Sequence, residues 1–228
     1  MDMKIPNPYE YYPRMHRGGD APIEVIGTEA YVRCNRALEG LLQDLLEVFR
    51  VVEPSSVSSA AYGPALQKLI FAACSEFEAQ CGGILRANGY PDTGRWTTQD
   101  YFELNEALGL QEYGLCLAQY AAYPEIRPFQ NWTTPGTTAS LAWFDVYNKL
   151  KHRNEECYHL GSIEVAVEAC AAVLVMCQAQ FGWSIFHEQG RIGQRVFRMT
   201  SAYSHSSHEQ YQFVDGRAGQ WVPVEYFK

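Results

Sequence analysis

Hydrophobic positions recur at helical spacing in several segments of the chain, and this pattern predicts a helical bundle. The first segment covers residues 28–52 and begins at Thr28, a residue suited to an N-cap. Its apolar positions are Tyr31, Leu38, Leu41, Leu42, Leu45, Leu46 and Phe49. The second segment runs from about Tyr62 to Ala87, with Pro64 in its first turn. Pro54 separates the two helices, because proline disfavours helical geometry in the residue before it.

Three more helices follow in the pattern. A short one begins near Thr98, which has Tyr101 rather than an acidic residue three positions later. Ser140 is the expected N-cap of the third main helix, "LAWFDVYNKLKHRN". Its predicted apolar face consists of Trp143, Phe144, Tyr147 and Leu150. Ser162 is expected to cap the fourth main helix, which is apolar on nearly all sides and should lie at the centre of the bundle.

The remaining segments lack helical periodicity. Residues 1–27 form an arm rich in proline, glycine and aromatic residues, and residues 113–132 are expected to be two short strands or an ordered loop. Residues 208–226 alternate on both sides of an Asp-Gly turn, which predicts a β hairpin. The prediction is an all-α fold of four main helices. It divides the chain into the arm at 1–27, a helical domain at 28–183, and a C-terminal appendage at 184–228 that contains the hairpin.

The composition of the chain predicts a large hydrophobic core and a net negative charge. Hydrophobic residues make up 47% of the 228 positions, and the formal net charge is −8. An acidic chain is a poor general binder of nucleic acid, because phosphate neutralisation needs basic residues. A small basic site within an acidic protein is still compatible with these numbers.

Seven cysteines are scattered along the chain, an odd number with no C-x-x-C spacing. Reduced, buried thiols are therefore expected rather than a disulfide framework. The N-terminal segment lacks the apolar stretch of a signal peptide, and the longest apolar run, residues 169–177, is too short to cross a bilayer. The sequence predicts a soluble, cytoplasmic protein that does not associate with a membrane.

Familiar catalytic motifs are missing from the sequence. It has no glycine-rich phosphate loop, no G-x-S-x-G and no H-E-x-x-H. His205 and His208 supply at most half of a metal site, so neither a metal nor a cofactor is expected. Glu76 and Glu78 do not form a catalytic pair, because residues two apart on a helix point about 200° away from each other.

Basic residues are clustered in the stretch "YNKLKHRNEECYHLGS", residues 147–162. Four basic residues occupy five positions: Lys149, Lys151, His152 and Arg153. One interpretation is a ribonuclease site. The other is the solvated C-terminal end of a helix, where cations favour the negative end of the helix dipole.

Arg153, the polar Asn154 and His159 resemble the arginine, polar residue and histidine motif of the HEPN superfamily. The resemblance extends over residues 28–183, where a helical core, a late "YNKLKH" helix and a closing apolar helix look like bacterial HEPN-like proteins. It implies a homodimer that pairs through the late helices, an interface to which the aromatic arm and the "WFDVYNKL" face would contribute apolar surface.

The resemblance also implies an activity, metal-independent RNA cleavage. His159 would transfer protons, Arg153 would hold the developing phosphorane charge, and Asn154 would orient one of them. Three further residues would bind flanking phosphates: Lys149, Lys151 and His152.

Geometry sets a condition on this site. Residues six apart on an unbroken helix point about 120° away from each other. Arg153 and His159 therefore meet only if the helix breaks between them, or if two subunits share one cleft. A toxin-like ribonuclease would also have an antidote-type protein partner. The alternative is a non-catalytic HEPN-like module for dimerisation or partner binding.

Overall fold

The computed structural model describes residues 29–87, 90–91, 94–181 and 192–202, and within them the chain is mostly helical. The longest helices are α1 (Glu29–Phe49), α2 (Pro64–Ala87), α3 (Thr98–Leu108), α4 (Ala142–His152) and α6 (Ile163–Phe181). The shorter elements are the 3-10 turns η1 (Leu110–Glu112), η2 (Thr138–Ser140) and η3 (Tyr158–Leu160), the helices α5 (Asn154–Cys157) and α8 (Ile192–Val196), and the strands β1 (Gly114–Leu117) and β2 (Phe197–Ser201). The predicted helical fold is confirmed, with a small antiparallel sheet beside it.

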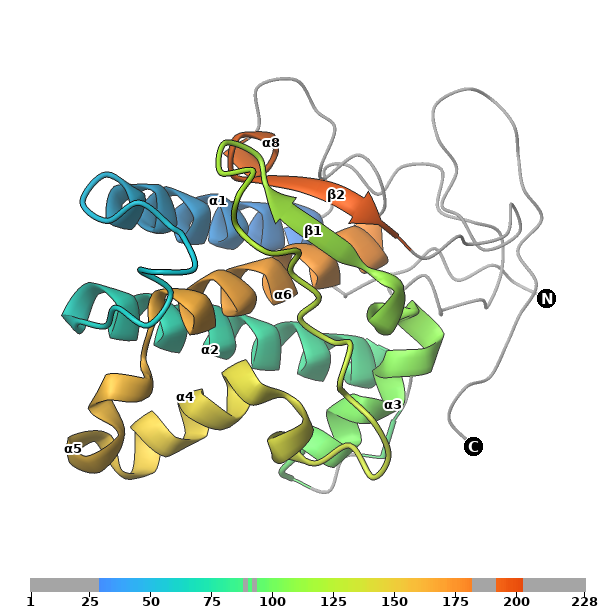
Figure 1. Cartoon of the computed structure of the whole chain (residues 1–228). Helices are drawn as coiled ribbons and strands as arrows, with labels where there is room; N and C mark the ends of the chain where they lie inside the picture. Colours follow the sequence, from blue (N-terminus) through green and yellow to red (C-terminus); the bar gives the residue numbers. More distant parts are fainter. Residues whose placement is uncertain (1–28, 88–89, 92–93, 182–191, 203–228) are drawn as a thin grey trace, which may run out of the picture.

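Helix α6 lies at the centre of the bundle, as its composition predicted. It packs against α1, α2 and α4 (Figure 1), and nearly all of its 19 residues are buried. Among the described residues it is the one helix long and apolar enough to cross a membrane, but 83% of its apolar window is inside the protein. Its position as the core of the bundle accounts for that composition.

Aromatic side chains fill the space between α2 and α4. The ring of Phe77 on α2 is fully buried, with its centroid 5.1 Å from that of Trp143 and 5.5 Å from that of Phe144. Phe129 and Trp132, which precede α4 in the chain, complete this cluster at 5.9 Å and 6.2 Å from Phe77. Edge-to-face contacts dominate, the arrangement that the ring quadrupoles favour.

The apolar face predicted for α4 is confirmed. The exposed fractions of Trp143, Phe144, Tyr147 and Leu150 do not exceed 3%. These side chains are buried within their own chain, so they leave no apolar surface on this face of α4 for a second subunit.

Helix α3 begins at Thr98, as predicted, but the capping residues expected for α3 and α4 are wrong. Thr97, not Thr98, caps α3, because its N–H and hydroxyl both donate to the Asp100 carboxylate, at 2.6 Å and 2.8 Å. The Thr98 hydroxyl is instead paired with that of Thr138. Ser140 ends η2 and donates to the Thr137 carbonyl, and α4 begins two residues later.

The start predicted at Ser162 is confirmed, whereas the N-cap predicted at Thr28 lies outside the described residues. The hydroxyl of Ser162 accepts a long hydrogen bond from the N–H of Val165, at 3.5 Å, as expected of an N-cap.

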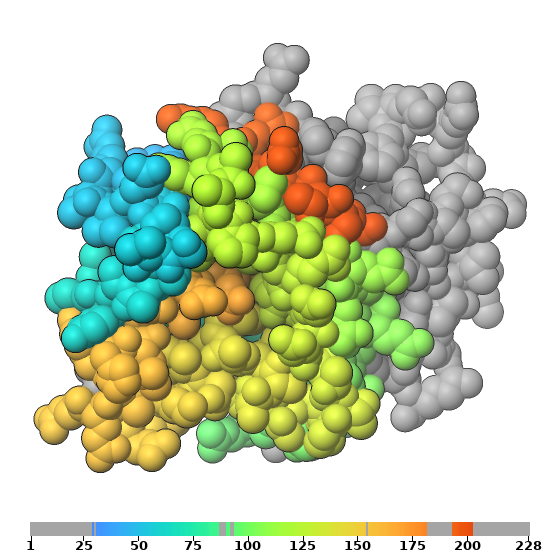
Figure 2. Space-filling model, in the orientation of Figure 1, coloured from blue at the N-terminus to red at the C-terminus, as the bar shows by residue number. Residues whose placement is uncertain are grey.

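The sheet joins segments that are far apart in the sequence. Strand β1 pairs antiparallel with β2, with Leu115 opposite Met199 and Leu117 opposite Phe197, and the two segments lie side by side in Figure 2. Helix α8 packs on α1, and its Val196 belongs to the buried core. Part of the predicted appendage therefore packs into the bundle. The predicted arm at 1–27 and hairpin at 208–226 lie outside the described residues, as do His205 and His208.

The cysteines are free thiols, and five of the seven are buried. Burial raises the pKa of Cys74, Cys81, Cys170 and Cys177, because the thiolate loses its hydration in the core. These thiols act as small apolar side chains, as the sequence indicated.

Candidate functional site

Helix α4 ends where the ribonuclease hypothesis required a break. Its last residue is His152, and Arg153 leaves the helix with φ −142° and ψ 51°. The short helix α5 and the turn η3 follow before α6 begins (Figure 1). Arg153 and His159 therefore do not lie on one continuous helix.

The basic side chains of this segment point to solvent. Lys151, His152, Arg153 and His159 are all exposed. Asn154 begins α5, and only its backbone is described. Exposure fits residues that contact a polyanion, but it leaves them without a recess that would hold a substrate.

Two of the predicted phosphate-binding lysines are engaged by neighbours on α4. The ammonium of Lys149 lies 2.6 Å from the Asp145 carboxylate. That of Lys151 lies over the Tyr147 ring, 5.3 Å from its centroid. These contacts hold both lysines against their own helix and partly neutralise the first of them.

The structure does not bring Arg153 and His159 together. Within the described part of the chain, neither side chain makes a hydrogen bond or an ion pair. A general base is normally oriented by a partner, and none is present for His159 here. The exposed carboxylates of Glu155 and Glu156 lie between them in the chain and weaken the positive potential that a phosphate would meet.

The backbone of this segment is nevertheless fixed against the start of α2. The ring of Tyr158 packs edge-on against Tyr62, with centroids 5.9 Å apart, and Tyr62 forms a β-bridge with Ser162. Gly161 allows a close approach, because a Cβ there would lie 3.3 Å from a methyl group of Leu150. The segment from Arg153 to Leu160 thus lies at the same end of the bundle as the α1–α2 connection (Figure 1).

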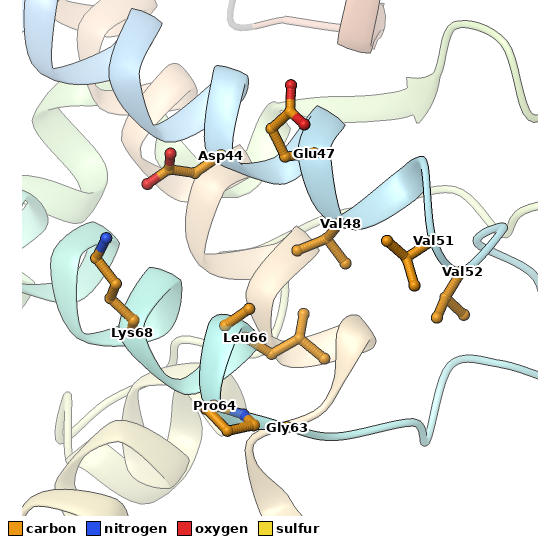
Figure 3. Close-up of a pocket in the computed structure, with 10 residues that line it drawn as sticks. Asp44, Glu47, Val48, Val51, Val52, Gly63, Pro64, Leu66 and Lys68 are labelled. Atoms are coloured by element: carbon orange, nitrogen blue, oxygen red, sulfur yellow. The ribbon is translucent and has the colours of Figure 1, made fainter.

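A second candidate site at this end of the bundle is an apolar groove, which the sequence did not reveal. It has a volume of about 370 Å³ and lies between the end of α1 and the start of α2 (Figure 3). Its lining includes the apolar residues Val48, Val51, Val52, Pro64 and Leu66. Val51 is 86% exposed, and Val57 on the same connection is 92% exposed. An exposed valine in the lining of an apolar groove is typical of a binding surface.

Opposite charges stand on the two rims of this groove. Asp44 projects from α1 and Lys68 from α2 (Figure 3), and both are exposed. Neither forms an ion pair with any residue that the structure describes. Glu47, also on the α1 rim, is paired with Arg50 at 3.1 Å. The groove therefore offers one unpaired charge of each sign.

The acidic stripe on α2 has a structural role. Glu78 accepts a hydrogen bond from the Tyr147 hydroxyl at 3.1 Å, and Glu76 accepts one from Gln80 at 2.9 Å. Burial raises the pKa of Glu76, against the opposing effects of Gln80 and of the Arg33 charge. The two carboxylates face different neighbours, as the helical spacing predicted.

Comparison with known proteins adds no further assignment. No protein-family model, no curated protein and no solved structure matches this chain. The function therefore has to be argued from the two surfaces at this end of the bundle.

Proposed function

We propose that this protein is a non-catalytic, HEPN-like helical module that pairs with a second copy of itself through the groove between α1 and α2. The observation that carries the proposal is the groove with its unpaired rim charges, Asp44 and Lys68. The exposed, unoriented Arg153 and His159 favour this function over catalysis.

Charge complementarity supports a second copy as the occupant. A two-fold axis places the same surface patch on both sides of an interface. Asp44 of one copy can then face Lys68 of the other, and the reverse pair forms at the same time. A two-fold dimer therefore pairs both rim charges of each copy, and no further charged residue is needed.

The apolar part of the groove supplies the attraction. Val51 lines the groove and is 86% exposed, so pairing would bury this side chain against the second copy. Burial of apolar surface drives most protein association, while rim charges set the register. The groove lies beside the segment that carries Arg153, so pairing would also bring the two basic segments near the interface.

Sedimentation of the full chain at about ten micromolar tests the pairing, with a two-fold dimer as the expected species. Asp44→Lys and Lys68→Asp should each give monomers, because each places like charges across the axis. The double variant Asp44→Lys with Lys68→Asp should restore the dimer. The matched control is Glu106→Lys, an exposed charge reversal on α3, which should leave the dimer intact.

A strict monomer at this concentration overturns the proposal. So does a dimer that both single reversals leave unchanged, since its interface would lie elsewhere. Circular dichroism of each variant should show unchanged helix content, which separates lost pairing from lost folding.

A second candidate function is metal-independent RNA cleavage, and one observation favours it. Helix α4 ends at His152, so Arg153 and His159 do not lie on one continuous helix. Each of them can therefore face a cleft that two copies share. In this function Arg153 and His159 are catalytic, Asn154 orients them, and the flanking basic residues bind phosphates: Lys149, Lys151 and His152. A cytoplasmic ribonuclease of this kind would be held in check by an antidote-type protein.

Purified protein should then cut single-stranded RNA in EDTA. His159→Ala and Arg153→Ala should abolish cutting, and Arg153→Lys should restore little, because a point ammonium cannot reproduce the planar fork of a guanidinium. Lys149→Ala should only weaken binding. Intact RNA after prolonged incubation with the dimer rejects catalysis and leaves the binding module.

A further inference from the structure

A small acidic cavity lies on the side of the bundle where α6 meets the α1–α2 connection and the loop after β1. Its volume is about 150 Å³. Glu164 and Glu168 of α6, Tyr123 of the loop, and Ser56 and Ser59 of the connection line it. Three separate segments of the chain therefore build one recess.

The two glutamates lie one helical turn apart, so their carboxylates share a face of α6. Glu164 is exposed and Glu168 is half-buried. Within the described residues, neither forms an ion pair or a hydrogen bond through its side chain. Burial, and secondly the charge of Glu164, raise the pKa of Glu168 from its ordinary 4.5 to about 7.

Tyr123 is an independent sign that the cavity receives a ligand. The residue is only 8% exposed, yet its hydroxyl has no hydrogen-bond partner in the described chain. Burial, followed by the charges of Glu164 and Glu168, raises its pKa to about 12, so the phenol lies close enough to feel both carboxylates. The hydroxyl itself is not fully buried, and because Tyr123 lines the cavity, it can bond a molecule that enters there.

We propose that this cavity binds a small organic cation with N–H donors, a guanidinium or a primary ammonium. Its charge would be neutralised by Glu164 and Glu168, and its N–H groups would donate to their oxygens and to the Tyr123 phenol. A planar guanidinium matches a pair of carboxylates well, because its donors lie in a fixed fork.

A metal ion is a poorer occupant of this site. No group of three or more His, Cys, Asp or Glu side chains within the described ranges is placed to hold one. Glu125 also borders the cavity, but its carboxylate is engaged by Thr200 and Arg127. The acceptors that remain are two carboxylates and a phenol, a set suited to N–H donors.

Binding should release a proton, because the cation favours ionised Glu168. The titratable groups that face Glu168 are Glu164 on its own helix and Tyr123 and Glu125 across the cavity. The pKa of Glu168 itself lies near neutral pH. A pKa of about 7 leaves it about a tenth ionised at pH 6 and nine-tenths at pH 8. The association constant should therefore rise about tenfold between these pH values.

Titration calorimetry of the full chain with methylguanidinium chloride at pH 6 and pH 8 tests the proposal. We expect binding at pH 8, about tenfold weaker binding at pH 6, and proton release near pH 6.5 detected in buffers of different ionisation enthalpy. Tetramethylammonium, a cation without N–H donors, should not bind. An arginine-containing tripeptide that binds more tightly than methylguanidinium would identify the source as a partner's side chain; the reverse order would identify a free small molecule.

Variants locate the site. Glu168→Gln keeps the size of the side chain, and it should lower affinity at pH 8 at least tenfold and remove the pH dependence. Tyr123→Phe should weaken binding by a few-fold, while Glu155→Gln, on the exposed helix α5, should change nothing. Absence of binding at millimolar methylguanidinium and pH 8, or unchanged binding by Glu168→Gln, would overturn the proposal.

Discussion

The aromatic cluster around Phe77 and the basic segment from Lys149 to His159 are connected by one helix, α4, yet they have opposite surroundings. Phe77 is fully buried and meets rings from α3, from α4 and from the loop before α4. Arg153 and His159 are exposed and have no side-chain partner in the described chain. Residues distant in sequence converge in the first region, whereas residues close in sequence stay apart in the second.

This difference separates two kinds of cluster. Burial of apolar surface is cooperative, so the fold fixes the geometry of Phe77 and its neighbours. Exposed charges gain little from any single arrangement, because water and salt screen them. Closeness in the sequence is therefore weak support for a catalytic site, and a second subunit or a substrate would have to provide the order that the single chain lacks.

The largest effect is expected in the aromatic cluster. Phe77→Ala should lower the free energy of unfolding by about 3–5 kcal/mol, because it removes a buried ring and leaves a cavity. Phe71→Ala, on the same helix but half-buried against Tyr147, should cost clearly less. Urea unfolding followed by circular dichroism measures both. Equal losses would show that the cluster is not the centre of the core.

The side chain of Glu168 is less buried than Phe77 and more buried than the basic segment. Its substitution should have the second largest effect on stability. Its pKa is raised in the folded state, so its contribution to stability is fully present below about pH 4.5 and is lost as pH rises through about 7. Glu168→Gln removes this dependence and should stabilise the fold at pH 8 by on the order of 2–3 kcal/mol. Melting temperatures measured from pH 4 to pH 8 check the sign. A variant that loses stability at pH 8 would contradict the assignment.

The cap of α3 should have a smaller effect. Asp100 accepts two hydrogen bonds from Thr97. Loss of hydration by itself would raise the pKa of Asp100, but these bonds and the one from Tyr90 together lower it. Asp100→Ala should cost about 1 kcal/mol at pH 7. Glu103→Ala, an exposed change on the same helix, is the control and should cost less. Chemical denaturation at pH 7 distinguishes them.

The smallest effects are expected in the basic segment. Arg153→Ala and His159→Ala should each change the free energy of unfolding by less than about 0.5 kcal/mol, because neither side chain packs or bonds within the described chain. A loss of several kcal/mol in either variant would reveal buried contacts and remove the contrast with Phe77.

Helical periodicity was sufficient to predict the main elements. The spacing of apolar residues located α1, α2, α4 and α6, and the nearly uniform apolarity of α6 indicated its central place. Helix starts were less predictable, because neighbouring threonines or serines compete for the same role. Thr97 rather than Thr98 meets Asp100, and Ser140 is used by η2.

What the sequence alone determined is therefore local: which stretches are helical and which faces are apolar. Tertiary structure decided everything that depends on convergence. It paired β1 with β2 across about eighty positions, placed the rims of the groove opposite each other, and brought Tyr123, Glu164 and Glu168 to one cavity. Helical period is encoded within a few residues, whereas convergence is decided by the packing of whole helices, which no local pattern contains.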